Sequence, residues 1–241
     1  MRLTVPLAER AEALLARGYE ELQSPAEQAP EVALRATLDA LSRGETHYTD
    51  RPGILPLRQA VTQSLKARFG IDIDPKANTV ITCGVTEARF VAVQQLLAPG
   101  EGLYVGAYGE RLEGALTVRG ARLEKGVGEA QALYLSSAIP EEAQRLLLDE
   151  AVEGALVVFD VEAGDSTFHP AQHPTFADRT VTIGDLGASD GLLSWRVGFL
   201  AAPPSTASGL RDFKQALTIC TTNLSQWAAL ALLEKDDVET R

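Results

Sequence analysis

Apolar residues in positions 1–45 recur at the three- and four-residue spacing of amphipathic helices. One group precedes Gly18 and a second precedes Gly44: Leu7, Ala11, Leu14 and Leu15, then Val32, Leu34, Leu38 and Leu41. Two helices are therefore predicted. The segment ELQSPAEQAP between them has two prolines and no periodicity, so we expect a linker there. A third helix is expected from Pro56 to Gly70, and its apolar face would comprise Leu57, Val61 and Leu65.

From Thr79 onward the pattern changes to short β-branched runs separated by helical segments. Several runs are apolar without alternation, which is typical of strands covered by helices on both faces. Seven strands are predicted, at residues 79–83, 102–107, 121–125, 132–137, 155–160, 180–185 and 197–202. Helices are expected at 86–98, 140–151, 206–221 and 224–235. This order predicts an α/β fold with three layers, α/β/α, around a seven-stranded, mostly parallel sheet.

The composition is that of an ordinary globular protein. The chain has 241 residues, of which 45% are hydrophobic and 23% charged, and its net charge is −11. An acidic chain without a cluster of cations repels nucleic acid and anionic lipid, so we expect neither as a partner. No apolar stretch reaches the length of a membrane span, and the Met1-Arg2-Leu3 start lacks a signal-peptide core, which favours a cytoplasmic protein.

Cysteine and histidine spacing argues against a metal site. Cys83 and Cys220 have no metal-type partner a few residues away. His169 and His173 are four residues apart, but the adjacent prolines break a helix. His47 is isolated in the sequence. We therefore expect no metal ligands in this chain.

Several motifs occur in a fixed order along the chain. Residues 47–101 contain Tyr48, Gly53, Leu57 and Arg58, then GVTEA from Gly84 and LAPGE at 97–101. VVFD follows at 157–160 and SWRVGFLAAP at 194–203. In this order the motifs resemble the large domain of class I/II aminotransferases, pyridoxal-phosphate (PLP) enzymes of fold type I. The expected domains are thus an N-terminal helical segment, 1–45, and an aminotransferase-like large domain, 46–241.

The resemblance implies a set of cofactor-binding residues. Val85 and Thr86, in the turn that opens a helix after Gly84, would bind the phosphate, and a helix N-terminus does favour an anion. Asp160 would hold the PLP ring nitrogen protonated, Tyr108 would stack on the ring, and Arg196 would contact the phosphate. Tyr48 would reach the phosphate of a neighbouring subunit, because the family's dimer interface is built largely from the large domain. A homodimer is therefore expected.

Structural interpretations of the same residues stay open. Asp160 could cap or pair within the end of the sheet, and Tyr108 could be a core or interface aromatic. Arg196 could pair with Asp185, which stands where the family has a phosphate-binding serine. We therefore expect Arg196 and Asp185 to face each other. A carboxylate beside a phosphate opposes binding, since like charges about 4 Å apart repel by roughly 4 kcal/mol at an effective dielectric of 20.

The residues that carry the family's covalent chemistry are missing from this pattern. Ala188 lies eight residues before Arg196, where the family has the lysine that forms a Schiff base with PLP. SSAIP, from Ser136, replaces the family's asparagine-containing loop, and Ala163 stands at a tyrosine position. The family's small domain, with its substrate-binding arginine, has no counterpart before Arg241. PLP binding is accordingly expected to be weak or lost.

These observations predict an aminotransferase-like protein that is degenerate and cannot form the usual internal aldimine. One alternative is an active transaminase that uses a lysine from elsewhere, with Lys125 and Lys214 as candidates. Lys214 is expected at a solvated helix surface, because lysine is rarely buried. The other alternative is a non-catalytic dimerisation or regulatory partner, either of itself or of a full-length aminotransferase.

Overall fold

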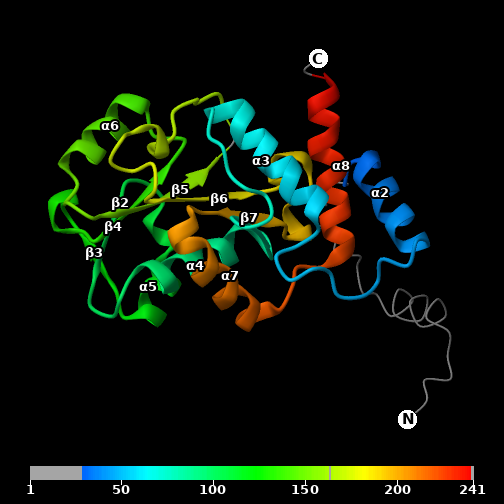
Figure 1. The fold of residues 1–241 in the computed structure, drawn as a ribbon, viewed down its shortest axis with the longest axis horizontal. Coiled ribbons are helices and arrows are strands. Elements are labelled where there is room, and N and C mark those ends of the chain that lie inside the picture. Colours follow the sequence, from blue (N-terminus) through cyan, green and yellow to red (C-terminus); the bar gives the residue numbers. More distant parts are fainter. Residues whose placement is uncertain (1–28, 163, 240–241) are drawn as a thin grey trace, which may run out of the picture.

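The computed structural model of the protein describes residues 29–162 and 164–239 (Figure 1). Seven strands form one sheet: β1 (Thr79–Thr82), β2 (Gly102–Val105), β3 (Arg122–Glu124), β4 (Ala132–Ser136), β5 (Leu156–Val161), β6 (Thr180–Asp185) and β7 (Gly198–Ala201). Their order across the sheet is β1-β7-β6-β5-β4-β2-β3. Strand β7 runs antiparallel to both of its neighbours, and the pairs from β6 to β3 are parallel. The predicted seven-stranded, mostly parallel sheet is confirmed.

The helices within the described residues are α2 (Glu31–Ser42), α3 (Leu55–Phe69), α4 (Gly84–Leu96), α5 (Glu113–Arg119), α6 (Glu141–Glu150), α7 (Pro204–Thr218) and α8 (Asn223–Glu239). The sequence pattern missed only α5 among them, because seven residues are too few for a clear apolar repeat. Helix α7 ends before the predicted residue 221, since Ile219 has a φ of 62°. The helix predicted around Leu7–Leu15 lies outside the described residues.

The sheet separates two hydrophobic cores, one for each layer of helices. Helices α3 and α8 cover one face, and α4, α5 and α7 cover the other (Figure 1). Successive side chains of a strand point to opposite faces. On β5, Val157 and Phe159 therefore enter the α3/α8 core, while Val158 enters the α4 core. The same alternation directs the next residue, Asp160, toward α4.

The remaining helix of the described N-terminal region, α2, packs against α8. Ala33 of α2 lies in a small buried cluster with Leu192, Ala228 and Leu232. The second of the two expected N-terminal helices thus packs on the α/β domain. Division of the chain into a segment at 1–45 and a domain at 46–241 stays a prediction.

The Leu57-Arg58 motif has a structural explanation. Leu57 is buried in the α3/α8 core, and the Arg58 side chain is almost fully buried beneath it. The Arg58 guanidinium donates to the carbonyl oxygens of Gly53 at 3.0 Å, Pro75 at 2.8 Å and Lys76 at 3.1 Å. This arginine therefore joins the chain before α3 to the loop that leads into β1.

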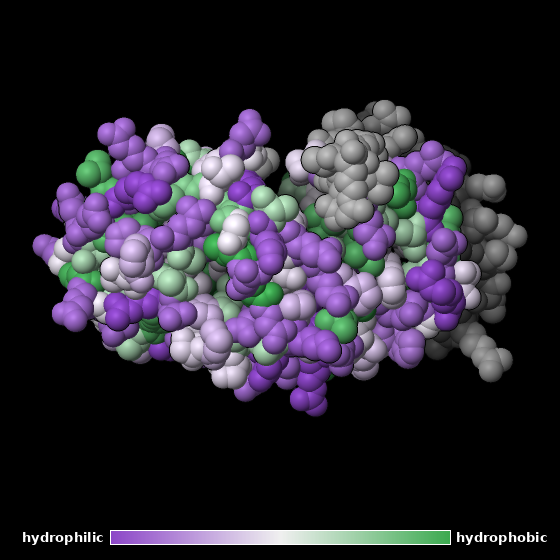
Figure 2. Space-filling view, turned by 45° about the horizontal axis from the view of Figure 1, so that its top comes forward, coloured by the Kyte–Doolittle hydropathy of each residue, from purple (hydrophilic) through white to green (hydrophobic). Residues whose placement is uncertain are grey.

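The surface agrees with the acidic composition. In Figure 2, hydrophilic residues predominate on the visible face and hydrophobic ones are scattered in small groups. Among the helices that the structure describes, none combines the length and the apolar character that crossing a membrane requires.

Candidate functional site

The carboxyl ends of β4, β5 and β6 meet the N-terminus of α4, and most of the predicted site residues lie there. Asp160 is the fifth residue of β5, and Asp185 is the last of β6. Both follow the strand alternation that points toward α4, because Val158 and Ile183, two residues earlier on their strands, lie in the α4 core. Ligand-binding groups of open α/β sheets gather at this edge.

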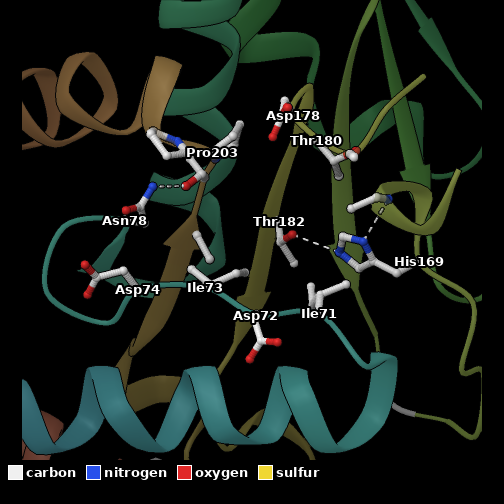
Figure 3. A pocket seen from close by; sticks show the side chains of 15 residues that line it. Ile71, Asp72, Ile73, Asp74, Asn78, His169, Asp178, Thr180, Thr182 and Pro203 are labelled. Atoms are coloured by element: carbon white, nitrogen blue, oxygen red, sulfur yellow. Dashed lines mark hydrogen bonds between the residues drawn. The ribbon is translucent and has the colours of Figure 1, made fainter. Parts of the chain in front are cut away.

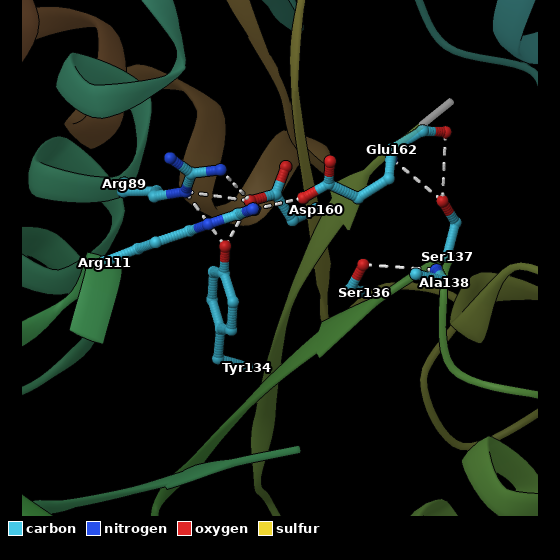
Figure 4. A network of polar contacts seen from close by, with 8 residues as sticks. All are labelled: Arg89, Arg111, Tyr134, Ser136, Ser137, Ala138, Asp160 and Glu162. Atoms are coloured by element: carbon cyan, nitrogen blue, oxygen red, sulfur yellow. Dashed lines mark hydrogen bonds and ion pairs between the residues drawn. The ribbon is translucent and has the colours of Figure 1, made fainter. Parts of the chain in front are cut away.

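Asp160 is held in a buried network with an arginine and a tyrosine (Figure 4). Arg89 of α4 donates to Asp160 Oδ2 from Nε at 2.8 Å and from Nη2 at 2.6 Å. Tyr134 of β4 donates its hydroxyl to the same oxygen and accepts from Arg89 Nε at 2.9 Å. Asp160 is 1% exposed and Tyr134 is fully buried. The structural interpretation of Asp160 as an ion-pair partner thus holds, with Arg89 as its partner.

Burial and charge act in opposite directions in this network. Burial raises the pKa of Asp160, while Arg89 and the Tyr134 hydroxyl lower it. Burial lowers the pKa of Arg89, but Asp160 and Tyr134 outweigh that effect and raise it. The pKa of Tyr134 is raised, first by burial and then by Asp160. We conclude that at neutral pH Arg89 is a cation, Tyr134 a neutral phenol and Asp160 a carboxylate, since removing either charge would leave the other buried and unpaired.

Asp185 lies at the N-terminal turn of α4. Burial raises the pKa of Asp185, and the nearby backbone N–H groups of Ala188 and Val85 lower it, as does the nearby charge of Arg89. Its Oδ1 is buried and has no hydrogen-bond partner in the described part of the chain. The N–H of Val85 was predicted to bind a phosphate, and a carboxylate of the chain itself lies near it. Thr86, the other predicted phosphate ligand, has an exposed side chain.

Strand β7 approaches this turn very closely. A Cβ atom at Gly198 would lie 2.7 Å from the carbonyl carbon of Gly84 and from the nitrogen of Val85. Only glycine fits such a contact between two backbones. The second glycine, Gly84, has a φ of 77°, in the left-handed region that glycine adopts without strain. The glycines of both motifs therefore fix the backbone around the site.

The predicted pair between Arg196 and Asp185 does not form. Arg196 has an exposed side chain that donates from Nη2 to the Cys83 carbonyl oxygen at 3.2 Å. Within the described residues Arg196 makes no ion pair. The charges that shift the pKa of Asp185 are those of Arg89, which lowers it, and Asp160, which raises it. The reason is geometric: Asp185 points inward to α4, and Arg196 follows a short 3-10 turn, Leu193–Trp195, that leaves its guanidinium at the surface.

The ring of Tyr108 is in contact with a guanidinium group of the same chain. It lies after β2 with a φ of 61° and is 38% exposed. The guanidinium carbon of Arg111 is 4.0 Å from the centroid of the ring, and Arg111 also pairs with Glu162, two residues beyond Asp160 (Figure 4). The predicted stacking residue is thus in contact with a side chain of the same protein.

The loop that starts at Ser136 binds the end of β5 through local hydrogen bonds. Ser136 Oγ accepts from the N–H of Ala138 at 3.2 Å. Ser137 Oγ accepts from the N–H of Glu162 at 2.8 Å and donates to the Glu162 carbonyl oxygen at 3.2 Å (Figure 4). The Ser137 hydroxyl therefore fixes the position of Glu162, and the Ser136 hydroxyl holds the loop itself.

Ala188 begins a 3-10 turn, Ala188–Asp190, after β6. It lines a cavity of about 540 Å³ on the α3 side of the sheet edge, together with Arg68, Glu162 and Asp185. The remaining cofactor candidate, Tyr48, is 78% exposed and lies elsewhere, beside a cavity of about 510 Å³ that His47 and Cys220 also line. Its predicted contact with a neighbouring subunit stays a prediction.

Neither candidate lysine lines the cavity beside Ala188. Lys214 was expected at a solvated surface, and this was wrong: it is 0% exposed, with Nζ 3.4 Å from Thr221 Oγ1. Its position on α7 continues the buried face of Ala207 and Leu210 at helical spacing, which explains the burial. Lys125 is exposed and follows β3, the strand at the far edge of the sheet.

Four residues of the site escaped the sequence analysis: Arg89, Arg111, Tyr134 and Glu162. Arg89 carried a detectable signal, because it is a charged residue next to the apolar Ala88, Val91 and Ala92 of a helix. A charge on a buried helix face requires a partner. Asp160 at the end of a neighbouring apolar strand was the available one.

A second buried polar group lies at the opposite edge of the sheet (Figure 3). His169 is 1% exposed and borders a cavity of about 220 Å³ near the start of β6. Its Nδ1 accepts from the N–H of Ala171 at 3.1 Å, so Nε2 carries the proton and donates to Thr182 Oγ1 at 2.9 Å. Burial lowers the pKa of His169 to about 3.

The strand order and the antiparallel β7 match the fold of the large domain of fold type I PLP enzymes. Comparisons of sequence agree. The sequence model of the family "Aminotransferase class I and II" matches residues 19–109. Over this part the chain is similar to the class I and II aminotransferase family, and the solved structures that resemble it have the same fold.

Particular relatives show how far the similarity extends. The chain is 27% identical to a probable N-succinyldiaminopimelate aminotransferase of Mycobacterium tuberculosis, over 88% of this chain and 62% of that protein. It is 28% identical to aromatic-amino-acid aminotransferase 2 of Thermococcus litoralis, over 98% and 69%. The crystal structure of an aromatic aminotransferase from Pyrococcus horikoshii matches with a TM-score of 0.78 at 21% identity, over 88% of this chain and 67% of that one. The chain thus spans about 62% of the first of these relatives.

Proposed function

We propose that this protein has the aminotransferase fold but does not carry out transamination by the covalent PLP route. The observation that carries the proposal is the pairing of Asp160 with Arg89. The carboxylate that the family resemblance assigns to the cofactor ring nitrogen already has a buried cationic partner. The residues at this site therefore do not fit PLP.

The alignment of the motifs supports the same proposal. Ala188, at the position of the family's lysine, has no group that can form a covalent bond to an aldehyde. A lysine from elsewhere is not favoured, because Lys214 has no exposed surface. Lys125 lies at the far edge of the sheet.

A titration with PLP tests this function directly. The purified protein would receive one equivalent of PLP, followed by visible absorbance, borohydride reduction and intact mass measurement. We expect no absorbance band of a protein-bound aldehyde and no stoichiometric adduct. Lys214→Arg is the matched control: an adduct that forms in the original protein and disappears in this variant would contradict the proposal and identify Lys214 as the reactive lysine.

A homodimer in solution is the second candidate property. Its support is Tyr48, a large aromatic side chain that is 78% exposed and borders the cavity with His47 and Cys220. Exposed aromatics beside a cavity are typical of protein interfaces. Such a dimer, or a mixed dimer with a full-length aminotransferase, would give the chain a non-catalytic role.

Sedimentation velocity tests the homodimer. We expect a dimer at micromolar concentration that Tyr48→Asp converts to a monomer, while Leu146→Asp, at an exposed position of α6, leaves it intact. A monomeric original protein would contradict the homodimer. If that monomer sedimented together with a full-length aminotransferase, the mixed dimer would take its place.

A further inference from the structure

We propose that charged side chains of the chain itself close the cofactor site of this fold, with Arg89 taking the place of the cofactor's ring nitrogen. This inference rests on the proposed function and deepens it. Ala188 in place of the lysine would prevent a covalent bond to PLP, but it would still allow PLP to bind non-covalently. The charges around Asp160 determine whether the ring can enter at all.

The ring-nitrogen position is closed most firmly. A protonated pyridine offers one N–H donor in the plane of its ring, while the Arg89 guanidinium offers two, from Nε and Nη2, to the same Asp160 oxygen. Tyr134 adds its hydroxyl to that oxygen and accepts from Arg89, so the three groups hold one another. An entering ring would have to displace Arg89 and leave its charge buried without a partner.

The ring-face position is closed by Arg111. Its guanidinium lies 4.0 Å from the centroid of Tyr108 and is tethered to Glu162, at the end of β5. A flat cation on an aromatic face occupies the area that a stacked heteroaromatic ring would use. Because Tyr108 and Arg111 are both partly exposed, this contact is weaker than the Asp160 network.

The phosphate position is closed by Asp185. Helix α4 favours an anion at its N-terminus, and the partly buried Asp185 carboxylate lies near the Val85 and Ala188 backbone, which lowers its pKa. A phosphate would compete for these N–H groups and would also be repelled by the carboxylate. Arg89 thus places a cation at the position of the ring nitrogen, and Asp185 places an anion at the position of the phosphate.

Replacement of Ala188 alone should therefore not restore cofactor binding. In an Ala188→Lys variant the amine would be present, but Asp160 would still be paired with Arg89. Adding Arg89→Met removes the cation and keeps a side chain of similar length. The double variant should then bind PLP, while the single variant should not.

The experiment compares PLP binding by Ala188→Lys with that by Ala188→Lys/Arg89→Met, using visible absorbance and intact mass after reduction. We expect at least a tenfold tighter dissociation constant for the double variant, and a further gain when Asp185→Asn is added. Equal affinity of the single and double variants would overturn the inference. A PLP adduct on the original protein would instead refute the proposed function, so the two failures are distinguishable.

A variant that keeps a positive charge at position 89 shows whether a gain in PLP affinity comes from the lost charge or from a change in folding. Ala188→Lys/Arg89→Lys keeps a cation beside Asp160 and is expected to stay closed to PLP. If it binds PLP as tightly as the Arg89→Met double variant, charge is not what closes the site and the inference fails.

Chemical rescue provides a readout that does not involve PLP. Arg89→Ala leaves space beside Asp160, and methylguanidinium at millimolar concentration is expected to raise its thermal unfolding midpoint by several degrees. The same salt should leave the original protein unchanged, because Arg89 fills the space. Absence of any rescue in a folded Arg89→Ala variant would show that Asp160 does not require a guanidinium there and would overturn the inference.

Discussion

Two buried polar groups lie at opposite edges of the same sheet, and they are stabilised in different ways. At the carboxyl edge, Asp160 is charged and needs a cation, which Arg89 supplies. At the amino edge, His169 is neutral and needs only the Ala171 N–H and the Thr182 hydroxyl. A buried charge thus required an ion pair from another helix, whereas a buried neutral ring is satisfied by two ordinary hydrogen bonds. The interactions at the carboxyl edge are therefore stronger than the two neutral hydrogen bonds at the amino edge.

The largest expected effect comes from breaking the charged network. Asp160→Asn leaves Arg89 buried without a counter-charge, and the free energy of unfolding should fall by about 3–5 kcal/mol. Urea denaturation at pH 7 measures it. Asp160→Leu combined with Arg89→Met removes both charges and should lose less than Asp160→Asn alone. A loss below about 1 kcal/mol in Asp160→Asn would show that the network stabilises the fold no more than the hydrogen bonds of His169 do.

The pH dependence of stability should separate the two edges. His169 has a folded pKa of about 3 and an unfolded pKa near 6.5, so the unfolded chain binds more protons between these values. Its neutral form therefore stabilises the fold fully above about pH 6.5, and this contribution is lost as the pH falls toward 3. At pH 5 the loss relative to neutral pH is about 2 kcal/mol.

His169→Gln checks this expectation, since glutamine has a similar size and does not titrate. Urea denaturation of both proteins at pH 7 and pH 5 would give the difference between them. The original protein should lose about 2 kcal/mol more than the variant over this range. Parallel loss in the two proteins would assign the pH dependence to other groups.

The smallest effect is expected from Arg111→Ala. Arg111 and Glu162 are both about one-third exposed, so water screens their ion pair, and its contact with Tyr108 lies at the surface. The free energy of unfolding should change by less than about 1 kcal/mol. Thermal and urea denaturation would measure it beside Asp160→Asn. A larger loss would mean that Arg111 belongs energetically to the buried network.

Much of the fold could be predicted from sequence, because apolar periodicity reports burial directly. The runs around Val80, Leu133, Val157 and Val181 are buried strands as expected. Helix α5 was missed because seven residues complete only two turns. The motif glycines and the position of Asp160 at a strand end were also predicted, since both follow from local backbone requirements.

The partners of the site residues could not be predicted in the same way. Arg196 is near Asp185 in the sequence, but the strand alternation and the left-handed Arg196 backbone direct the two side chains apart. Arg89 is seventy-one residues from Asp160 and meets it only because α4 packs on β6 and β7, and β6 is the neighbour of β5. Lys214 was assigned to the surface by its residue type, although the helical spacing from Ala207 and Leu210 placed it inside. Pairing across elements depends on packing, which residue preferences alone do not contain.

The contact between Gly198 and the start of α4 limits which substitutions the protein can accept. Side chains around the site can be exchanged while the two backbones stay in place, because their contact involves no side chain. A single methyl group at Gly198, by contrast, would force strand and helix apart. At this point the protein therefore tolerates substitution of the reactive side chains but not a change in backbone position. The fold can persist even when every reactive group of the site is replaced.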